Sequence, residues 1–354
     1  MRIVSERLHN QKLSSPGLKQ AVDVVRWLGA VQAQDFPAAK WALGLRLRAA
    51  TDAAIEQAYN EGQILRTHLM RPTWHFVAPD DIRWLLELTA PRVNARSGPN
   101  YRKYELDAAV FKQTNKVLIK ALQGGKHLTR AELRAALNKS GVAADDIVRL
   151  AHIMLRAELD GVVCSGRRRG KQFTYALMDE RVAEAETLTR DEALAKLTER
   201  YLTSHGPATL QDFIWWSGLT ASDAKRGVES VDRELRKELV HNKTYWLPRA
   251  KPSARPSLYS AHLLPAYDEY NVAYKDRQNV IDDATTEMSA WDLLGPTVIV
   301  DGKVAGNWKA TPDRQAVTIT VKPTRSLKKS ERLAIVAAAD RYAAFLGIPA
   351  HVHI

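Results

Sequence analysis

The residues most able to do chemistry lie between Gly29 and Pro37, where the sequence reads GAVQAQDFP. Gln32 and Gln34 are two positions apart, and Asp35 follows them directly. Pro37 favours extended geometry at the residue before it, so we expect a break between two helices here. In an extended segment, residues i and i+2 point to the same side. Two side-chain amides could then hold one water molecule, with the Asp35 carboxylate close by. Without further context, such a pair is more typical of a solvated loop.

The elements around this stretch are predicted to follow the order of a winged helix, three helices and then a hairpin. Pro37 suits the first turn of the second helix, and Thr51 can cap the third helix, which ends near Gly62. Two short runs rich in β-forming residues flank Met70-Arg71-Pro72 and form the hairpin. The expected bounds are 18–29, 37–47 and 51–62 for the helices and 64–69 and 73–77 for the strands.

The same order returns twice along the chain, with capping boxes at Thr129-Arg130-Ala131-Glu132 and a similar start at Thr209-Leu210-Gln211-Asp212. Because one unit is repeated, the repeat is more informative than any single element. The second copy is expected to have helices over 107–123, from 129 and over 145–159, and strands over 162–165 and 172–177. The third is expected to have helices over 192–204, 209–218 and 222–235, and a hairpin over 238–247 that turns at Asn242-Lys243.

The character of the chain changes after a predicted linker at 251–257. Asp301-Gly302 is a strong hairpin signal, and Ser330 can cap a last helix that ends at Gly347. We therefore predict a mainly α fold with β-hairpin wings, of the α+β class. The expected domains are a first winged helix with the Gln-Ala-Gln loop, a second with a basic wing, a third winged helix and a C-terminal β-rich α+β domain. Their bounds are 1–88, 106–180, 188–250 and 258–354.

The charge balance favours a polyanionic partner. Lys and Arg exceed Asp and Glu by 52 to 40, which fits nucleic acid, although a soluble protein can also be basic without a nucleic-acid partner. The sharpest basic feature is the second hairpin tip, where Arg167, Arg168, Arg169 and Lys171 surround a glycine. In a chain with winged-helix order we expect this tip to contact DNA phosphates rather than to be only a solvated turn.

Four more candidate DNA-binding residues lie on or near the first hairpin: Arg66, His68, Arg71 and His75. That hairpin belongs to the same predicted unit as the glutamine stretch, so it could border the same site. For His75 taken alone, a buried core histidine is the favoured interpretation.

Several other chemistries have no support in the sequence. The single cysteine, Cys164, permits neither an internal disulfide nor a cysteine-based zinc site. The chain has no glycine-rich nucleotide loop, no His-Glu-x-x-His motif and no nucleophile elbow, although a Ser-His-Asp triad stays open. No apolar run reaches a membrane span of about 18 residues, and no signal peptide is evident, so we expect a cytoplasmic protein. Trp215-Trp216 is most simply core.

Four segments carry a resemblance to a known family: LGAVQAQDFPAAKWALGLR (28–46), LMRPTWHFV (69–77), LLPAYDEYNVAYKDR (263–277) and VIVDGKVAGNW (298–308). Together they resemble the AlkZ and YcaQ family of DNA glycosylases, and the resemblance covers nearly the whole chain. It implies three tandem winged helices and a C-terminal β-rich part, curved around a DNA channel. The family signature is Gln, an apolar residue and Gln, or Gln-x-Asp, and Gln32-Ala33-Gln34 matches the first form. Enzymes of the family remove alkylated purines, and some unhook interstrand crosslinks.

The residue types fit this chemistry. A purine alkylated at N7 or N3 is cationic, so its glycosidic bond is weak and the leaving group has little need of an acid. The enzyme must then place a water and stabilise an oxocarbenium-like transition state. A glutamine carbonyl can accept a hydrogen bond from that water, and Asp35 could serve equally as a base or as a helix cap.

We therefore predict a monofunctional DNA glycosylase with Gln32, Gln34 and Asp35 as catalytic residues and water as the nucleophile. It would act as a monomer on double-stranded DNA carrying alkylated purines, with no metal or cofactor. The main alternative is a non-catalytic winged-helix DNA-binding protein such as a regulator. A structural or protein-binding module is a third class, and it would have no salt-dependent affinity for DNA.

Overall fold

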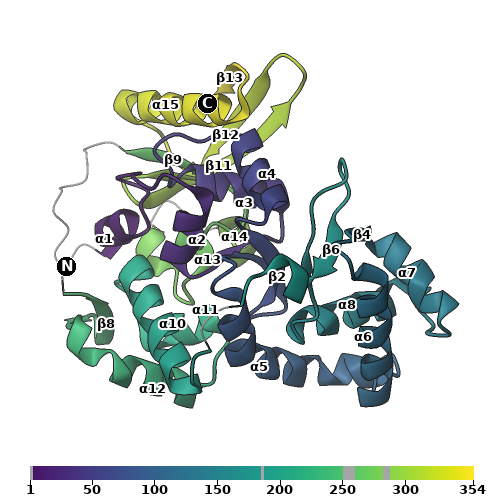
Figure 1. The fold of residues 1–354 in the computed structure, drawn as a ribbon. Coiled ribbons are helices and arrows are strands. Elements are labelled where there is room, and N and C mark those ends of the chain that lie inside the picture. The colour runs from purple at the N-terminus through teal and green to yellow at the C-terminus, as the bar shows by residue number, and fades with distance from the viewer. Residues whose placement is uncertain (1–2, 185–186, 250–259, 282–287) are drawn as a thin grey trace.

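The fold is that of a computed structural model that describes residues 3–184, 187–249, 260–281 and 288–354 (Figure 1). The predicted linker at 251–257 lies outside the described residues. Figure 1 shows the N-terminal elements in the centre, a teal group around α6–α8 on the right and a green group around α10–α12 at the lower left. The C-terminal sheet and α15 lie at the top.

The first group of elements forms around the glutamine stretch as predicted, and it contains one strand more. The short strand between the first two helices pairs with the second hairpin strand, which gives a three-stranded sheet in the order β1-β3-β2. Thr51 caps α4 by accepting the N–H of Ala54 at 3.2 Å. The second helix ends at Gly44 rather than near Leu47. The elements are α2 (Ala21–Leu28), β1 (Val31–Gln32), α3 (Phe36–Gly44), α4 (Asp52–Glu61), β2 (Leu65–Leu69) and β3 (Thr73–Val77).

The second group repeats this order, with the sheet order β4-β6-β5. The capping box at the start of α7 is confirmed: the hydroxyl of Thr129 accepts the N–H of Glu132, and a Glu132 oxygen accepts the N–H of Thr129 at 2.7 Å. The elements are α6 (Ala108–Leu122), β4 (Leu128–Thr129), α7 (Arg130–Lys139), α8 (Ile147–Leu159), β5 (Val163–Ser165) and β6 (Thr174–Leu177), followed by α9 (Met178–Arg181).

The third group has the same order, but a single bridge between Ala208 and Trp246 replaces the short strand. Its hairpin turns at His241-Asn242, one residue earlier than predicted, because both of these residues have positive φ. The elements are α10 (Arg190–His205), α11 (Leu210–Ser217), α12 (Ala221–Ser230), the 3-10 turn η1 (Asp232–Glu234), β7 (Leu235–Val240) and β8 (Lys243–Pro248).

Helices α1 and α5 were not predicted. α1 (Ile3–Asn10) packs against α10 of the third group, and the guanidinium of Arg7 donates at 2.9 Å to Pro207 O, between α10 and α11. α5 (Ile82–Lys103) is a 22-residue helix that joins the first group to the second. It contains Pro91 and Pro99. Because proline ordinarily ends a helix, the sequence pattern did not indicate α5.

The C-terminal part is an α+β layer, as predicted. Its five strands have the order β13-β12-β11-β10-β9 and are antiparallel except for the β12–β13 pair. Asp301-Gly302 turns the β10–β11 hairpin with positive φ at both positions. The last helix begins at Lys329, so Ser330 lies inside it and is not its cap. The elements are β9 (Ala261–Leu264), α13 (Glu269–Val272), η2 (Gln278–Val280), α14 (Ala290–Leu294), β10 (Thr297–Val300), β11 (Lys303–Pro312), β12 (Val317–Pro323), α15 (Lys329–Leu346) and β13 (Ala350–His353).

The first group and the C-terminal sheet are packed as one body. Buried side chains from α2–α4 and from β9–β12 and α15 form one hydrophobic cluster, with Trp41 against Phe345 and Tyr342. Residues 1–88 and 258–354 were predicted as separate domains, but they share this core. The shared core matters for the site, because it brings the segment after β9 into contact with the glutamine stretch.

A fully buried ion pair reinforces the same contact. Nη1 and Nη2 of Arg46 each donate to one oxygen of Asp268 at 2.9 Å, and neither side chain has exposed surface. Nη2 also donates to Gln11 Oε1 and Nη1 to Ala42 O, and Asp268 also accepts the N–H of Tyr270. A buried pair with several hydrogen-bond partners fixes the position of the segment after β9 relative to α3. Loss of either side chain of the pair leaves the other charge buried without a counterion.

We predict that Arg46→Met lowers the free energy of unfolding by about 3–5 kcal/mol, because Asp268 is then buried without its cation. Urea denaturation followed by fluorescence measures the change. The exposed Arg26–Asp80 pair supplies a matched control, and Arg26→Met should cost less than about 1 kcal/mol. If the two variants lose equal stability, the buried pair is not the anchor described above.

Candidate active site

The main chain between α2 and α3 begins in extended geometry, as the sequence predicts, and it bends at Gln34 and Asp35. Gly29 ends α2 with φ of +84°, and a side chain there would press against the Trp216 ring, 3.3 Å away. The chain then enters β1, where Gln32 lies opposite His75 of β3. Ala33 N donates to Trp74 O at 2.7 Å, which continues the pairing past β1. The stretch is therefore held on one side by the hairpin.

Gln32 is fixed at both its main chain and its side chain. Its N–H donates to Glu269 Oε1 at 2.9 Å, and its Oε1 accepts from Arg71 Nη2 at 3.0 Å. Only 7% of Gln32 is exposed. Since a guanidinium can only donate, this contact defines which amide atom is the oxygen. The oxygen keeps a second lone pair, and the amide nitrogen keeps its two donors.

Gln34 and Asp35 are both exposed. The N–H of Trp74 donates to Gln34 Oε1 at 3.3 Å, so this amide too is oriented by a donor on the hairpin. Asp35 Oδ1 accepts the N–H of Ala38 at 3.0 Å and caps α3. Of the two roles considered for Asp35, the structure therefore shows the helix cap.

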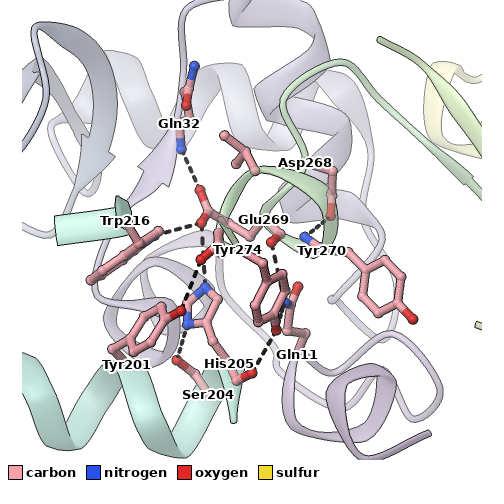
Figure 2. Close-up of polar contacts among 12 residues, drawn as sticks. Gln11, Gln32, Tyr201, Ser204, His205, Trp216, Asp268, Glu269, Tyr270 and Tyr274 are labelled. Atoms are coloured by element: carbon pink, nitrogen blue, oxygen red, sulfur yellow. Dashed lines mark hydrogen bonds and ion pairs between the residues drawn. The ribbon is translucent and has the colours of Figure 1, made fainter. Parts of the chain in front are cut away.

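Glu269 lies directly beneath the glutamine stretch (Figure 2). It has no exposed surface, and it accepts the Gln32 N–H and, at 2.9 Å, the indole N–H of Trp216. His205 Nε2 is 3.4 Å from its second oxygen. Burial alone raises the pKa of Glu269, but His205, the Gln32 N–H and the Arg71 charge outweigh burial and hold this pKa at about 2. An ionised, desolvated carboxylate thus supports Gln32, whose side chain points away from it in Figure 2.

The turn that carries Arg71 is packed against the end of α11. Gly218 has φ of +70°, and a side chain there would lie 2.5 Å from Met70 O, so only glycine allows this approach. Arg71 Nη1 reaches Trp215 O at 3.3 Å while Nη2 holds Gln32. Burial lowers the pKa of Arg71, although Glu269 opposes this effect. Arg71 therefore joins the glutamine stretch to the third group.

The two predicted histidines of the first hairpin face inward. His68 Nδ1 lies 2.7 Å from Glu158 of α8, and 9% of the residue is exposed. His75 has no exposed surface, its Nδ1 contacts Thr73 O at 2.9 Å, and burial lowers its pKa to about 3. A neutral, buried His75 cannot contact a phosphate, so the predicted DNA contact is wrong in this conformation and the core interpretation is correct.

Arg66 is half-buried rather than free on the surface. Its guanidinium lies over the rings of Trp74 and Phe173, and it donates to Ala33 O at 2.9 Å. It holds the middle residue of the Gln-Ala-Gln stretch, a role that its position in the sequence did not indicate.

The basic hairpin tip divides into two kinds of residue. Arg168 packs over Phe36 and Phe173 and pairs with Glu56, and Arg169 pairs with Glu132 at 2.8 Å. Arg167 and Lys171 are exposed. Arg168 therefore ties the tip to the first group, and Arg167 and Lys171 keep their charges in solvent.

Two supporting residues of the site, Glu269 and His205, were not singled out from the sequence, and the contact of Trp216 with Glu269 was not predicted. The available signal was the acidic pair Asp268-Glu269 inside an otherwise apolar run, in a segment that also carries the family resemblance. Trp216 is core as predicted, but Trp215 is 41% exposed, so the prediction that it is core was wrong. The side-by-side tryptophans point in different directions because they lie on consecutive positions of a helix.

The described part of the chain contains no group of three or more His, Cys, Asp or Glu side chains placed to hold a metal ion. None of its helices is both long enough and apolar enough to cross a bilayer.

Comparison with known proteins places the chain in a family. The profile of the family "DNA glycosylase AlkZ-like" matches residues 25–345. The interstrand DNA cross-link repair glycosylase of Streptomyces sahachiroi is 25% identical over 345 residues, which are 90% of this chain and 89% of that protein. The solved structure of Streptomyces sahachiroi DNA glycosylase AlkZ aligns with a TM-score of 0.79 and 21% identity, over 99% of this chain and 98% of that one. At that identity the structural likeness shows the fold alone. The family match extends over most of the chain, including the glutamine stretch and Glu269, and the chain therefore belongs to the AlkZ-like DNA glycosylase family.

Proposed function

We propose that this DNA glycosylase hydrolyses the N-glycosidic bond of alkylated, cationic purines in double-stranded DNA. The observation that carries the proposal is the pair of oriented amides: the oxygens of Gln32 and Gln34 each accept one protein donor and keep a lone pair. Those lone pairs suit a water hydrogen and the positive charge that develops on the sugar. A relative named for cross-link repair supports crosslinked purines as part of the substrate range.

The protonation states of two groups near Gln32 support a cationic leaving purine. Glu269 is buried and ionised, and His75 is buried and neutral, with pKa values of about 2 and about 3. Neither group holds a proton that it could readily give to a departing base at neutral pH. A base that already carries positive charge leaves without that proton. Neutral lesions such as uracil should therefore be poor substrates.

The repeated order of helices and hairpin, with a short strand or a single bridge after the first helix, supports three winged-helix units at 1–88, 106–180 and 188–250. The C-terminal α+β domain at 258–354 shares its core with the first unit. We propose that these units line the DNA-binding face and that Arg71, Arg167 and Lys171 are among its contacts. Gln32 and its partners Arg71 and Glu269 belong to the same chain, so this part of the site needs no residue from a second copy, which supports a monomer. A DNA substrate implies a cytoplasmic location. Family membership favours an enzyme over the regulator considered as the alternative.

Gln32→Ala and Gln34→Ala should each slow base release by on the order of 10-fold to 1,000-fold, the range for losing one preorganised electrostatic group. Duplex affinity should stay near the wild-type value, because phosphate contacts elsewhere hold the DNA. Single-turnover release from a duplex with N7-alkylguanine, measured beside binding to the same duplex, tests this. Wild-type release by both variants would rule out the water-positioning role. Tight binding without base release by the wild type would support the regulator instead.

Asp35→Asn separates the two roles of Asp35. Asparagine is also a good N-cap, so a capping role predicts stability and base release close to wild type. A loss of release as large as that of the glutamine variants, in a stably folded protein, would show that Asp35 is the base.

Replacing Arg167 and Lys171 by Gln should weaken duplex binding and reduce the slope of log Kd against log salt by about two, since each lost phosphate contact removes about one released counterion. Arg168→Gln serves as the comparison, because Arg168 is held by Glu56 and two aromatic rings and should change stability more than the slope. An unchanged slope in the double variant would remove this tip from the DNA interface.

A further inference from the structure

A basic cavity of about 200 Å³ lies next to the glutamine stretch and is separate from its amide oxygens. Four segments far apart in the sequence form it: the turn with Arg71, α5 with Arg92 and Arg96, α11 with Trp215, and the chain after α13 with Lys275. Arg92, Arg96 and Lys275 are exposed, and Arg71 is half-buried. The cavity is therefore open to a ligand from solvent.

The charges of the cavity are unbalanced. Four cationic side chains line it, and no acidic residue does. Arg92, Arg96 and Lys275 form no ion pair within the described part of the chain, whereas many other arginines on the surface do. Like charges that converge without a counterion repel one another and lower stability. An anion bound between them would relieve this repulsion.

The cavity is also held in place by buried contacts. The N–H of Lys275 donates at 2.9 Å to Asp212, which is 1% exposed. The indole N–H of Trp215 donates to Val272 O at 3.0 Å, and 41% of this tryptophan is exposed beside the cations. Arg71 connects the cavity to the active site, because one of its nitrogens reaches Trp215 O and another holds Gln32.

We infer that this cavity binds a backbone phosphate of the DNA strand close to the nucleotide under attack, with the adjoining sugar against the Trp215 ring. The inference rests on the proposed function for the position of that nucleotide at Gln32. Arginine guanidinium groups bind phosphate oxygens through paired hydrogen bonds. Because Arg71 lines the cavity and also contacts Gln32, the phosphate would lie on the DNA strand near the nucleotide held at Gln32. Phosphate binding would then affect the position of the Gln32 amide, because the Arg71 guanidinium would contact both the phosphate and Gln32 Oε1.

The test replaces Arg92 and Arg96 by Gln, which removes two charges at i and i+4 on α5. Lys112→Gln with Lys116→Gln is the matched control, since these exposed lysines have the same spacing on α6. Binding to an undamaged duplex is measured between about 50 and about 200 mM salt, the range where phosphate contacts show most clearly. The cavity variant should raise Kd on the order of tenfold and lower the salt slope by about two, and the control should do neither.

Base release from an alkylated duplex distinguishes this subsite from the catalytic residues. A phosphate contact present in both ground and transition states should raise KM and leave kcat nearly unchanged, the reverse of the result expected for Gln32→Ala. Trp215→Leu should raise Kd without changing the salt slope, because no charge is removed, and Trp215→Phe should restore most of the affinity.

The outcomes separate the two proposals. If the cavity variant binds like the control or like the wild type, the phosphate subsite is wrong even if base release is robust. If the wild type releases no alkylated base, the proposed substrate is wrong, and the comparison of salt slopes on undamaged DNA still decides whether the cavity takes a phosphate.

Discussion

A buried carboxylate charge is costly unless every lone pair meets a donor, and Glu269 is the place where this constraint shapes the protein. Its two hydrogen-bond donors come from β1 and from α11, and His205 at the end of α10 lies 3.4 Å from it, while Glu269 itself belongs to the C-terminal part. These segments must come together for the charge to be tolerated. The same requirement fixes the main chain of Gln32, because the Gln32 N–H is one of the donors.

The contacts of Glu269 and Arg71 hold the Gln32 amide rigidly, whereas the Gln34 amide is accessible to solvent. Gln32 is bound through its main chain and through Arg71, and Gln34 is exposed with one contact from the hairpin. Preorganised dipoles of this kind act without reorganising during the reaction, which is the usual way for an enzyme to stabilise developing charge. Arg71 offsets the negative charge of Glu269, and it also lines the basic cavity. The position of the Gln32 amide, the charge of Glu269 and the proposed DNA contact are therefore coupled through Arg71.

Much of the fold can be predicted from local sequence signals. The residues that hold the candidate catalytic side chains in place cannot be predicted in this way. The threefold order of helices and hairpins follows from hydrophobic spacing, capping residues such as Thr129 and turn residues such as Asp301-Gly302. α5 was missed because two prolines interrupt its pattern, although tertiary packing keeps it helical. Gln32, Gln34 and Asp35 could be singled out because their spacing is local. Glu269 could not be given a role, because its partners are up to 237 residues away and no local pattern links them. The burial of His68 was not predicted, because residue type does not show which face of a strand is covered, whereas the core interpretation favoured for His75 is correct.

The most direct test of the account is base release by Glu269→Gln. The substitution keeps the shape of the side chain but removes the charge, and it turns one acceptor into a donor that faces either the N–H of Gln32 or the indole N–H of Trp216. Displacement of Gln32 by a fraction of an ångström to one ångström should slow single-turnover release of an N7-alkylpurine by on the order of 100-fold. Duplex affinity should stay near wild type, and Glu331→Gln, a buried carboxylate on α15, should release the base normally. Wild-type release by Glu269→Gln would contradict the claim that this buried charge positions the catalytic amide.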